Sequence, residues 1–204
     1  MIKKKILVLG NDPQINEIQF SRLLPDIETF GVNRIFLAHT PDYFFFQDPE
    51  IFKELDKQPQ YLDALTAKSK IFTSDWFIRN GRSSPPWAKV ISRSHQILQL
   101  FPDSVTTGIR LLSDNFIDRS KYTFYVAGVG LNWSEPSHFW KQLNYPGLNT
   151  NGKAWYDKRF IRIIDNFKRL KSLNFEIVSV HPHSQLNRYF RYESIGNLYS
   201  KEKS

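Results

Sequence analysis

Short runs of β-branched, aliphatic and aromatic residues recur along this chain, and each run stops at a turn residue. Residues 5–9 end at Gly10 and residues 122–127 end at Gly128, and further runs cover residues 28–33, 42–46, 70–73 and 175–180. A compact apolar run bounded by turn residues is typical of a strand that is buried on both faces. Helical segments separate these runs, so the sequence predicts an α/β fold with a doubly wound, mostly parallel, Rossmann-like sheet.

The helical segments are predicted from caps and from apolar spacing. Asp12 and Pro13 predict the start of a helix over residues 14–24. A short acidic side chain caps a helix, and the first position of a helix tolerates proline because the N–H there needs no partner within the helix. Further helices are predicted over residues 49–55, 106–119 and 156–173. The last of these has apolar residues three and four positions apart, which is the spacing of one helix face.

The length of 204 residues predicts a single α/β domain over residues 1–204. Residues 134–155 are rich in Pro, Gly, Asn and Trp and predict an irregular, lid-like insert. The chain has no cysteine, which excludes disulfides and thiolate metal sites. The apolar run at residues 6–9 is too short for a signal peptide, and no run approaches the ~18 residues that span a bilayer. We therefore expect a cytoplasmic location, with peripheral contact at the inner membrane as an option.

A net charge of +8 is compatible with anionic membranes, nucleic acids and phosphorylated small molecules. The basic residues are densest over residues 153–171, where a solvated helix face and a contact with anionic lipid are both open interpretations. Trp76, Trp87 and Trp133 are candidates for exposed aromatic residues that stack on nucleic-acid bases. The basic residues follow no nucleic-acid-binding motif, so we expect no nucleic-acid partner.

Ligands of doubly wound sheets bind outside the carboxyl ends of the strands, so the turns at those ends are the first candidates for a site. Gly10-Asn11-Asp12 follows the first predicted strand, where a glycine and a helix start suit a phosphate, and a plain βα turn is the alternative. Gly128-Val129-Gly130 follows the strand over residues 122–127. Its two glycines allow close contact with a base or ribose, and a tight turn is again the alternative.

Thr106-Thr107-Gly108 opens a later predicted helix, where hydroxyl groups suit either an anionic ligand or ordinary capping. Asp157 and His138 are the candidate bases that could take a proton from a hydroxyl group. Helix capping for Asp157 and simple exposure for His138 are the alternatives.

No metal site is predicted. The chain contains no Asp-x-Asp pair, and His181-Pro182-His183 is its only close pair of histidines. Two histidines that are two positions apart on a strand point the same way, but the intervening proline breaks a strand.

The order of several short blocks resembles the bacterial sialyltransferase family that includes the Campylobacter lipooligosaccharide enzymes. That family opens with a lysine-rich strand, Gly-Asn-Gly-Pro and a Glu-Ile-aromatic-Ser-Arg-Leu helix, and it later has Thr-Ser-Gly, Leu-Ser-Gly-Ile and Cys-Pro-Asn-Ser. The similar blocks here are residues 4–13, 17–23, 30–33, 44–49, 106–108, 126–129 and 180–184.

The resemblance implies a metal-independent transferase that moves sialic acid or a related keto-sugar from a CMP-sugar donor to a glycan acceptor, with no cofactor beyond the donor. It implies a single displacement in which Asp157 or His138 is the base. Together with the turns above, it implies a nucleotide site that comprises Gly10, Asn11, Asp12, Asn33, Asp48, Thr107, Gly108, Gly128, Val129 and Gly130.

Several positions depart from the family pattern. Asp12 stands where the family has glycine, Gly130 where it has aspartate, and Ser104 where it has arginine. The family's tyrosine pair falls near Asn132 and His138, and its histidine base falls at about Asp157. A nucleotide-binding protein of the same fold without catalysis, and a basic nucleic-acid-binding protein, are therefore the alternative functions.

Overall fold

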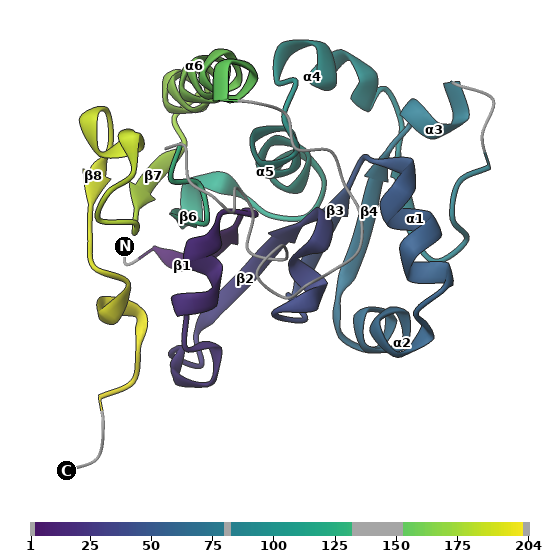
Figure 1. Cartoon of the computed structure of the whole chain (residues 1–204), viewed down its shortest axis with the longest axis horizontal. Coiled ribbons are helices and arrows are strands. Elements are labelled where there is room, and N and C mark those ends of the chain that lie inside the picture. Colours follow the sequence, from purple (N-terminus) through teal and green to yellow (C-terminus); the bar gives the residue numbers. More distant parts are fainter. Residues whose placement is uncertain (1–2, 80–82, 132–152, 202–204) are drawn as a thin grey trace.

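The structure, a computed structural model, describes residues 3–79, 83–131 and 153–201. Its centre is one sheet of parallel strands in the order β5-β4-β3-β2-β1-β6-β7-β8 (Figure 1). The strands are β1 (Lys4–Leu9), β2 (Ile27–Val32), β3 (Tyr43–Phe46), β4 (Lys70–Ser74), β5 (Lys89–Ile91), β6 (Tyr122–Ala127), β7 (Glu176–Ser179) and β8 (Arg191–Tyr192). The predicted parallel, doubly wound sheet is confirmed.

Helices cover both faces of the sheet. The α-helices are α1 (Pro49–Asp56), α2 (Pro59–Lys68), α3 (Trp76–Arg79), α4 (Ser94–Leu100), α5 (Ser104–Asn115) and α6 (Lys153–Ser172). The 3-10 helices are η1 (Pro13–Glu17), η2 (Phe20–Arg22), η3 (Asn33–Leu37), η4 (Arg119–Lys121), η6 (Gln185–Arg188) and η7 (Ile195–Leu198). Figure 1 shows α4, α5 and α6 on one side of the sheet and α1 and α2 on the other.

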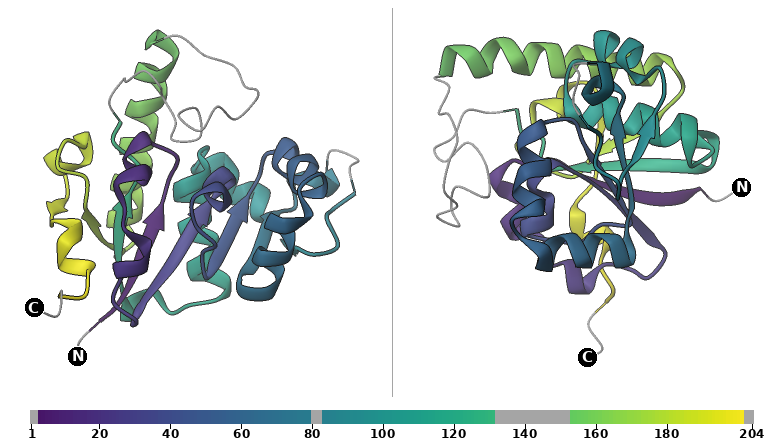
Figure 2. Two further views of the ribbon diagram at one scale, coloured as in Figure 1. Left: turned by 60° about the horizontal axis from the view of Figure 1, so that its bottom comes forward. Right: turned by 90° about the vertical axis from the view of Figure 1, so that its right-hand side faces the viewer.

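Alternate strand residues belong to two separate cores. Val8 and Phe45 pack with residues of α5 and α6 on one face, whereas Leu9 and Phe46 pack with residues of η1, α1 and α2 on the other. This division follows from the two-residue period of a strand. Figure 2 shows the two helical layers from two further sides, with the sheet between them.

The chain reverses direction across the sheet once. From β1 it proceeds strand by strand to β5, and it then returns through α4 and α5 to β6, which pairs with the other side of β1. The topological switch point therefore lies between the carboxyl ends of β1 and β6. In open parallel sheets this is the place where ligands bind.

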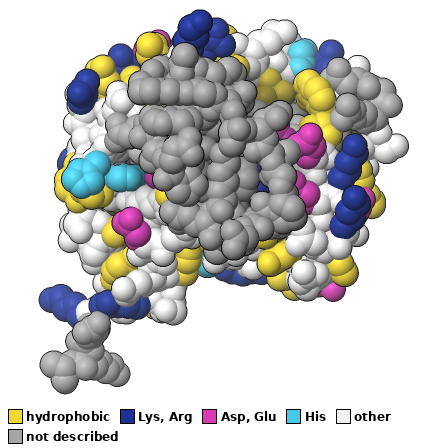
Figure 3. All heavy atoms as spheres, in the orientation of Figure 1, with side chains coloured by type: hydrophobic (Ala, Val, Ile, Leu, Met, Phe, Trp, Pro, Cys, Tyr) yellow, Lys and Arg dark blue, Asp and Glu magenta, His cyan; other side chains and the backbone are white. Residues whose placement is uncertain are grey.

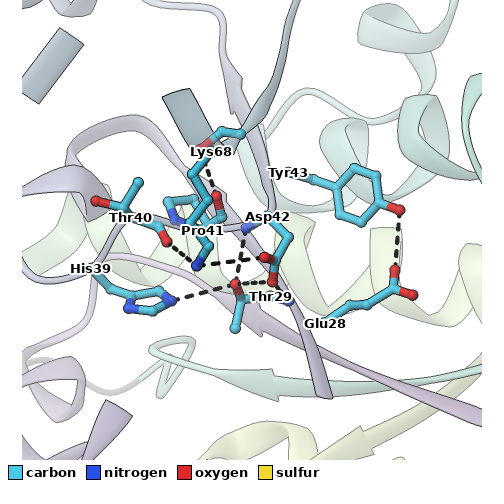
Figure 4. A network of polar contacts seen from close by, with 9 residues as sticks. Glu28, Thr29, His39, Thr40, Pro41, Asp42, Tyr43 and Lys68 are labelled. Carbon is cyan, nitrogen blue, oxygen red and sulfur yellow. Dashed lines mark hydrogen bonds and ion pairs between the residues drawn. The ribbon is translucent and has the colours of Figure 1, made fainter. Parts of the chain in front are cut away.

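A network of polar contacts connects neighbouring strands near their amino ends, on the opposite side of the sheet from the switch point (Figure 4). The backbone and hydroxyl groups of Thr29 each donate a hydrogen bond of 2.7 Å to Asp42, and Lys68 Nζ donates to Thr40 O at 2.7 Å. Burial alone would raise the pKa of Asp42, but these hydrogen bonds and nearby Lys68 hold the pKa below its ordinary value. The network joins the amino ends of β2, β3 and β4.

The predicted helix over residues 14–24 is wrong. The structure has two short 3-10 helices there, η1 and η2, separated by Ile18 in an extended conformation. Tertiary hydrogen bonds replace the helical ones: the Gln19 N–H donates to the Tyr199 hydroxyl at 3.0 Å, and the Leu24 N–H donates to Leu198 O at 2.9 Å. Asp12 is nevertheless the predicted N-cap, since it accepts a hydrogen bond from the Gln14 N–H at 3.1 Å.

Candidate active site at the carboxyl edge

The turns that follow β1 and β6 are bonded to each other. The Gly10 N–H donates to Ala127 O at 2.9 Å, and the Asp12 N–H donates to Gly128 O at 3.0 Å. A Cβ atom on Gly10 would lie 2.3 Å from Gly128 O, and Gly128 itself has a φ of +65°. Both positions therefore require glycine, and the two predicted turns meet at the switch point.

Residues after β7 form hydrogen bonds to the turn that follows β6. The Ser184 hydroxyl donates to Val129 O at 2.8 Å, and the Gln185 N–H donates to Gly130 O at 3.0 Å. Hydrogen bonds thus join the segments that follow β1, β6 and β7.

Buried polar atoms without a hydrogen-bond partner gather at this edge. Within the described residues, three of them are the amide oxygens of Asn11, Asn33 and Gln47, which follow β1, β2 and β3. The Ser74 and Ser179 hydroxyls, in the last residues of β4 and β7, are also unpartnered. The remaining such atoms lie in Trp87 and Asn187. Because an unmet buried polar group costs about 1–3 kcal/mol, their concentration at one edge is typical of a site that meets a polar ligand.

The N-terminus of α5 lies beside the end of β2. Asn33 Nδ2 donates to Ser104 Oγ at 3.1 Å, and the N-cap Asp103 accepts a hydrogen bond from the Thr106 N–H at 2.9 Å. The helix therefore starts two residues before the predicted Thr106. The cap takes up the Thr106 N–H, and the Thr107 N–H donates to Asp103 O at 3.1 Å, so the N–H groups of Ser104 and Val105 are the ones left for a ligand at this end of the helix.

The side chains expected from the Thr-Thr-Gly block lie deeper. The Thr107 hydroxyl donates to Phe101 O, and Thr107 is fully buried. A Cβ atom on Gly108 would lie 2.5 Å from the Phe30 ring and 2.9 Å from the Phe45 ring. Gly108 therefore serves the packing of α5 on the sheet, and Ser104 is the polar residue of this helix that reaches the strand ends.

Two side chains that sequence reasoning did not pair meet at the switch point. His181 Nε2 lies 3.9 Å from Asp12 Oδ1, and both side chains are mostly buried. The sequence indicated His181 only as a partner of His183. Among the described residues no group of three His, Cys, Asp or Glu side chains could hold a metal ion.

Asp48 follows β3, and its charge environment is mixed. Burial raises the pKa of its carboxyl group, while Arg159 of α6 and Arg34 of η3 partly offset that rise. Asp48 precedes α1 without capping it through its side chain. Its carboxyl group is therefore not committed to the helix.

The two candidate bases remain predictions. His138 and the predicted insert at residues 134–152 lie outside the described residues. Asp157 belongs to the first turns of α6, and its side chain is not part of the described structure.

Solved sialyltransferase structures share this architecture. The sialyltransferase CstII in complex with a trisaccharide acceptor and CMP is 17% identical, the match covers 97% of this chain and 89% of that chain, and the TM-score is 0.62. CstII from Campylobacter jejuni in complex with cytidine-5'-monophosphate is 16% identical, with 98% and 88% covered and a TM-score of 0.57. The monofunctional α-2,3-sialyltransferase Cst-I from Campylobacter jejuni is 17% identical, with 100% and 92% covered and a TM-score of 0.52.

The chain has the fold of these sialyltransferases. The likeness extends over nearly the whole chain, in agreement with the order of the sequence blocks. The sequence matches no protein-family model, and a search of curated proteins found no match either. In the described part of the chain, no helix combines the length and the apolar character needed to span a bilayer.

Within this sialyltransferase fold, one carboxylate at the carboxyl edge has a structural use. Asp75 follows β4 and accepts hydrogen bonds from the Ser94 hydroxyl and the His95 N–H, both at 2.8 Å, and from Arg79 at 3.2 Å. Burial alone would raise the pKa of Asp75, but these hydrogen bonds outweigh it and lower the pKa to about 2. The carboxylate therefore joins the end of β4 to the start of α4.

The lowered pKa of Asp75 predicts a dependence of stability on pH. The charged form is favoured in the folded state, so its contribution is present above pH ~4 and is lost as the pH falls toward ~2. Asp75→Asn should lower the free energy of unfolding by about 2 kcal/mol at pH 7, because each pKa unit corresponds to about 1.4 kcal/mol. Urea denaturation of both proteins between pH 7 and pH 2.5 should show the difference shrinking below pH 4; a constant difference would contradict this role.

A separate hollow of about 540 Å³ lies between η3 and α2, toward the amino ends of β3 and β4 and away from the carboxyl ends of the strands. Phe36, His39, Tyr61 and Lys68 are among its lining residues. Burial, with nearby Lys68, lowers the pKa of His39 to about 4. None of the lining side chains carries an unpartnered buried polar atom, so the carboxyl edge is the stronger candidate for the active site.

Proposed function

We propose that this protein is a glycosyltransferase that moves sialic acid or a related keto-sugar from a CMP-sugar to a glycan acceptor. The observation that carries the proposal is the row of unpartnered amide oxygens of Asn11, Asn33 and Gln47 beside the glycine turns of the switch point. The same fold in CstII is described in complex with CMP and a trisaccharide acceptor. The polar groups at the carboxyl ends of the strands are of the type that binds a nucleotide-sugar.

In this proposal the reaction is a metal-independent single displacement at the anomeric carbon. The Gly10 and Asp12 N–H groups are bonded to Ala127 O and Gly128 O. The Asn11 N–H and the first N–H groups of α5 are therefore the donors that stabilise the departing phosphate, since donors fixed in a protein oppose a developing negative charge effectively. Asp157 or His138 takes the proton from the acceptor hydroxyl. The proposed nucleotide site comprises Gly10, Asn11, Asp12, Asn33, Asp48, Gly128, Val129 and Gly130, with Ser104 in place of Thr107 and Gly108, which are taken up by the packing of α5.

The exposure of tryptophan and basic side chains bears on whether nucleic acid or an anionic membrane is a partner. Trp76 and Trp87 are half-buried and pack against the core beneath α1 and α2, so the expected exposed stacking surface for nucleic acid is not found at these positions; Trp133 lies outside the described residues. On the face shown in Figure 3, Lys and Arg side chains lie at several separate places. A cytoplasmic enzyme with a peripheral contact to an anionic membrane remains our proposal, with the exposed Lys158 and Arg162 of α6 as the contacting charges.

A thermal-shift comparison of CMP, UMP, GMP and AMP tests the function. Ligand at 100 times its dissociation constant stabilises a protein by about 2.7 kcal/mol, which corresponds to a Tm increase of about 5–10 °C for a domain of this size. CMP alone should produce this increase, and a CMP-sialic acid donor should then be hydrolysed or transferred. Binding of CMP without either reaction would indicate the catalytically inactive alternative, and equal shifts with all four nucleotides would contradict a CMP site.

A further inference from the structure

The sheet order places three chain segments side by side at the switch point. Strands β1, β6 and β7 are neighbours, and Asp12, Gly130 and His181 follow them. Gly130, after the middle strand β6, has no side chain. A Cβ atom there would lie 2.7 Å from Asp12 Oδ2 and 3.3 Å from His181 Nε2. The glycine therefore allows the two flanking side chains to meet above it.

The environment of His181 sets which of its nitrogens carries the proton. The backbone N–H of His183 donates to Nδ1 of His181 at 3.1 Å, so Nδ1 is an acceptor and the neutral ring carries its proton on Nε2. Burial lowers the pKa of His181, and Asp12 only partly offsets this. At neutral pH the ring is therefore an uncharged donor whose Nε2–H faces Asp12.

Asp12 supplies the matching acceptor. It accepts a hydrogen bond from the Gln14 N–H at 3.1 Å, and burial raises the pKa of its carboxyl group. The separation of 3.9 Å between Asp12 Oδ1 and His181 Nε2 is longer than a hydrogen bond. It suits a single group placed between the two, one that donates to the carboxylate and accepts from the imidazole. A hydroxyl group does both.

We propose that Asp12 and His181 together bind one ribose hydroxyl of the nucleotide. The inference rests on the proposed function. A carboxylate repels a phosphate, so the phosphate belongs on the side of Asn11, Asn33 and the α5 N-terminus, and the uncharged ribose belongs beside Asp12. The turn at Gly128–Gly130 lies directly beside this pair, and its second glycine keeps the space between Asp12 and His181 clear of a side chain.

The test compares the dissociation constants of CMP, 2′-deoxy-CMP and 3′-deoxy-CMP by titration calorimetry. The unaltered protein should bind one of the deoxy nucleotides about tenfold more weakly or worse than CMP, because a hydrogen bond to a charged group is lost. Asp12→Asn and His181→Phe should weaken CMP binding by a similar factor and remove most of the difference between CMP and that deoxy nucleotide. Glu17→Gln and His183→Ala are the matched controls and should leave all three constants unchanged, since any residue at position 183 retains the backbone N–H.

The Tm of Asp12→Asn separates this role from helix capping, and two further variants test the position of the carboxylate. Asparagine caps a helix as well as aspartate, and burial disfavours the charged carboxylate, so Asp12→Asn should not lower the Tm. Gly130→Asp should weaken CMP binding, because its side chain would collide with the Asp12 carboxylate. The double variant Asp12→Gly/Gly130→Asp should recover binding relative to either single variant, because it brings a carboxylate to the same place from the neighbouring strand end.

Each other outcome overturns a stated part of the account. If the unaltered protein does not bind CMP, the proposed function itself fails. If it binds CMP and both deoxy nucleotides equally, the hydroxyl assignment alone fails. An Asp12→Asn protein with unchanged CMP affinity and reduced sugar transfer would place the pair on the acceptor, and a loss of the preference for CMP over UMP would place it on the base; both results overturn the assignment to ribose.

Discussion

Glu54→Ala should lower the free energy of unfolding by about 3–5 kcal/mol. Arg34 of η3 donates through Nε to Glu54 Oε2 at 3.0 Å and through a second nitrogen to Oε1, so the pair is bidentate. The two side chains are only 10% and 19% exposed. Removal of the carboxylate leaves the Arg34 guanidinium without its bidentate partner, and the charge of nearby Asp48 offsets the desolvation cost only in part.

Urea denaturation of the two proteins measures this effect. Asp114→Ala is the matched control, because Asp114 pairs with Arg110 at 2.6 Å near the surface, with side chains 25% and 29% exposed. A surface pair of this kind contributes less than about 0.5 kcal/mol. The double variant Arg34→Met/Glu54→Leu should recover much of the loss, since both charges are then removed. A loss below about 1 kcal/mol in Glu54→Ala would show that the pair does not hold η3 against α1.

Gly128→Val should destabilise the protein by about 3 kcal/mol or more and abolish CMP binding. The φ of +65° at Gly128 costs a residue with a side chain about 1–2 kcal/mol, and a β-branched residue is less tolerated still. A Cβ atom there would also lie 2.6 Å from Ile15 Cδ1 and 3.1 Å from the Gly10 carbonyl carbon, and overpacking of this kind costs about 1–3 kcal/mol. Since Gly128 O holds the Asp12 N–H, the proposed nucleotide site moves with it.

Gly196→Ala is the control for Gly128→Val. A Cβ atom on Gly196 meets only the Ser194 hydroxyl, at 3.4 Å, and the position has no positive φ. Its Tm and CMP affinity should match those of the unaltered protein. A Gly128→Val protein that keeps its Tm would show that the turn after β6 is not held in the described conformation.

The six inner strands of the sheet were predictable because each is an apolar run that is mostly buried. The run at residues 122–127 coincides with β6, and the runs that begin at Lys5 and Lys70 give β1 and β4 to within a residue. The edge strands β5 and β8 were missed. Each is short, and β8 consists of two exposed residues, so neither carries the apolar pattern on which the prediction depends.

The helices depended more on tertiary contacts. Helix α2 was missed, because its start at Pro59 follows α1 after two residues without a polar cap from a side chain. Helix α5 was predicted to start two residues late, because the cap comes from Asp103 rather than from the threonines that follow it, and it ends at Asn115, four residues before the predicted end at residue 119. The start of α2 thus has no local cap to recognise, whereas the start of α5 depends on a capping hydrogen bond that was assigned to the wrong residue.

The candidate site also has a part that the local sequence predicts and a part that depends on tertiary structure. The glycine turns at Gly10 and Gly128 could be predicted, because a glycine after a buried strand is a local signal. The meeting of Asp12 and His181 could not, because it depends on the order of β1, β6 and β7 in the sheet. The signal that could have found it was the absence of a side chain at Gly130, together with an acid and a histidine at the neighbouring strand ends.

A crystal structure of the protein with bound CMP tests the central claim most directly. We expect the nucleotide to lie across the ends of β1 and β6, with its phosphate toward Asn11, Asn33 and the start of α5, and its ribose beside Gly128–Gly130. CMP bound instead in the hollow between η3 and α2, or no bound CMP at concentrations that shift the Tm, would contradict the account.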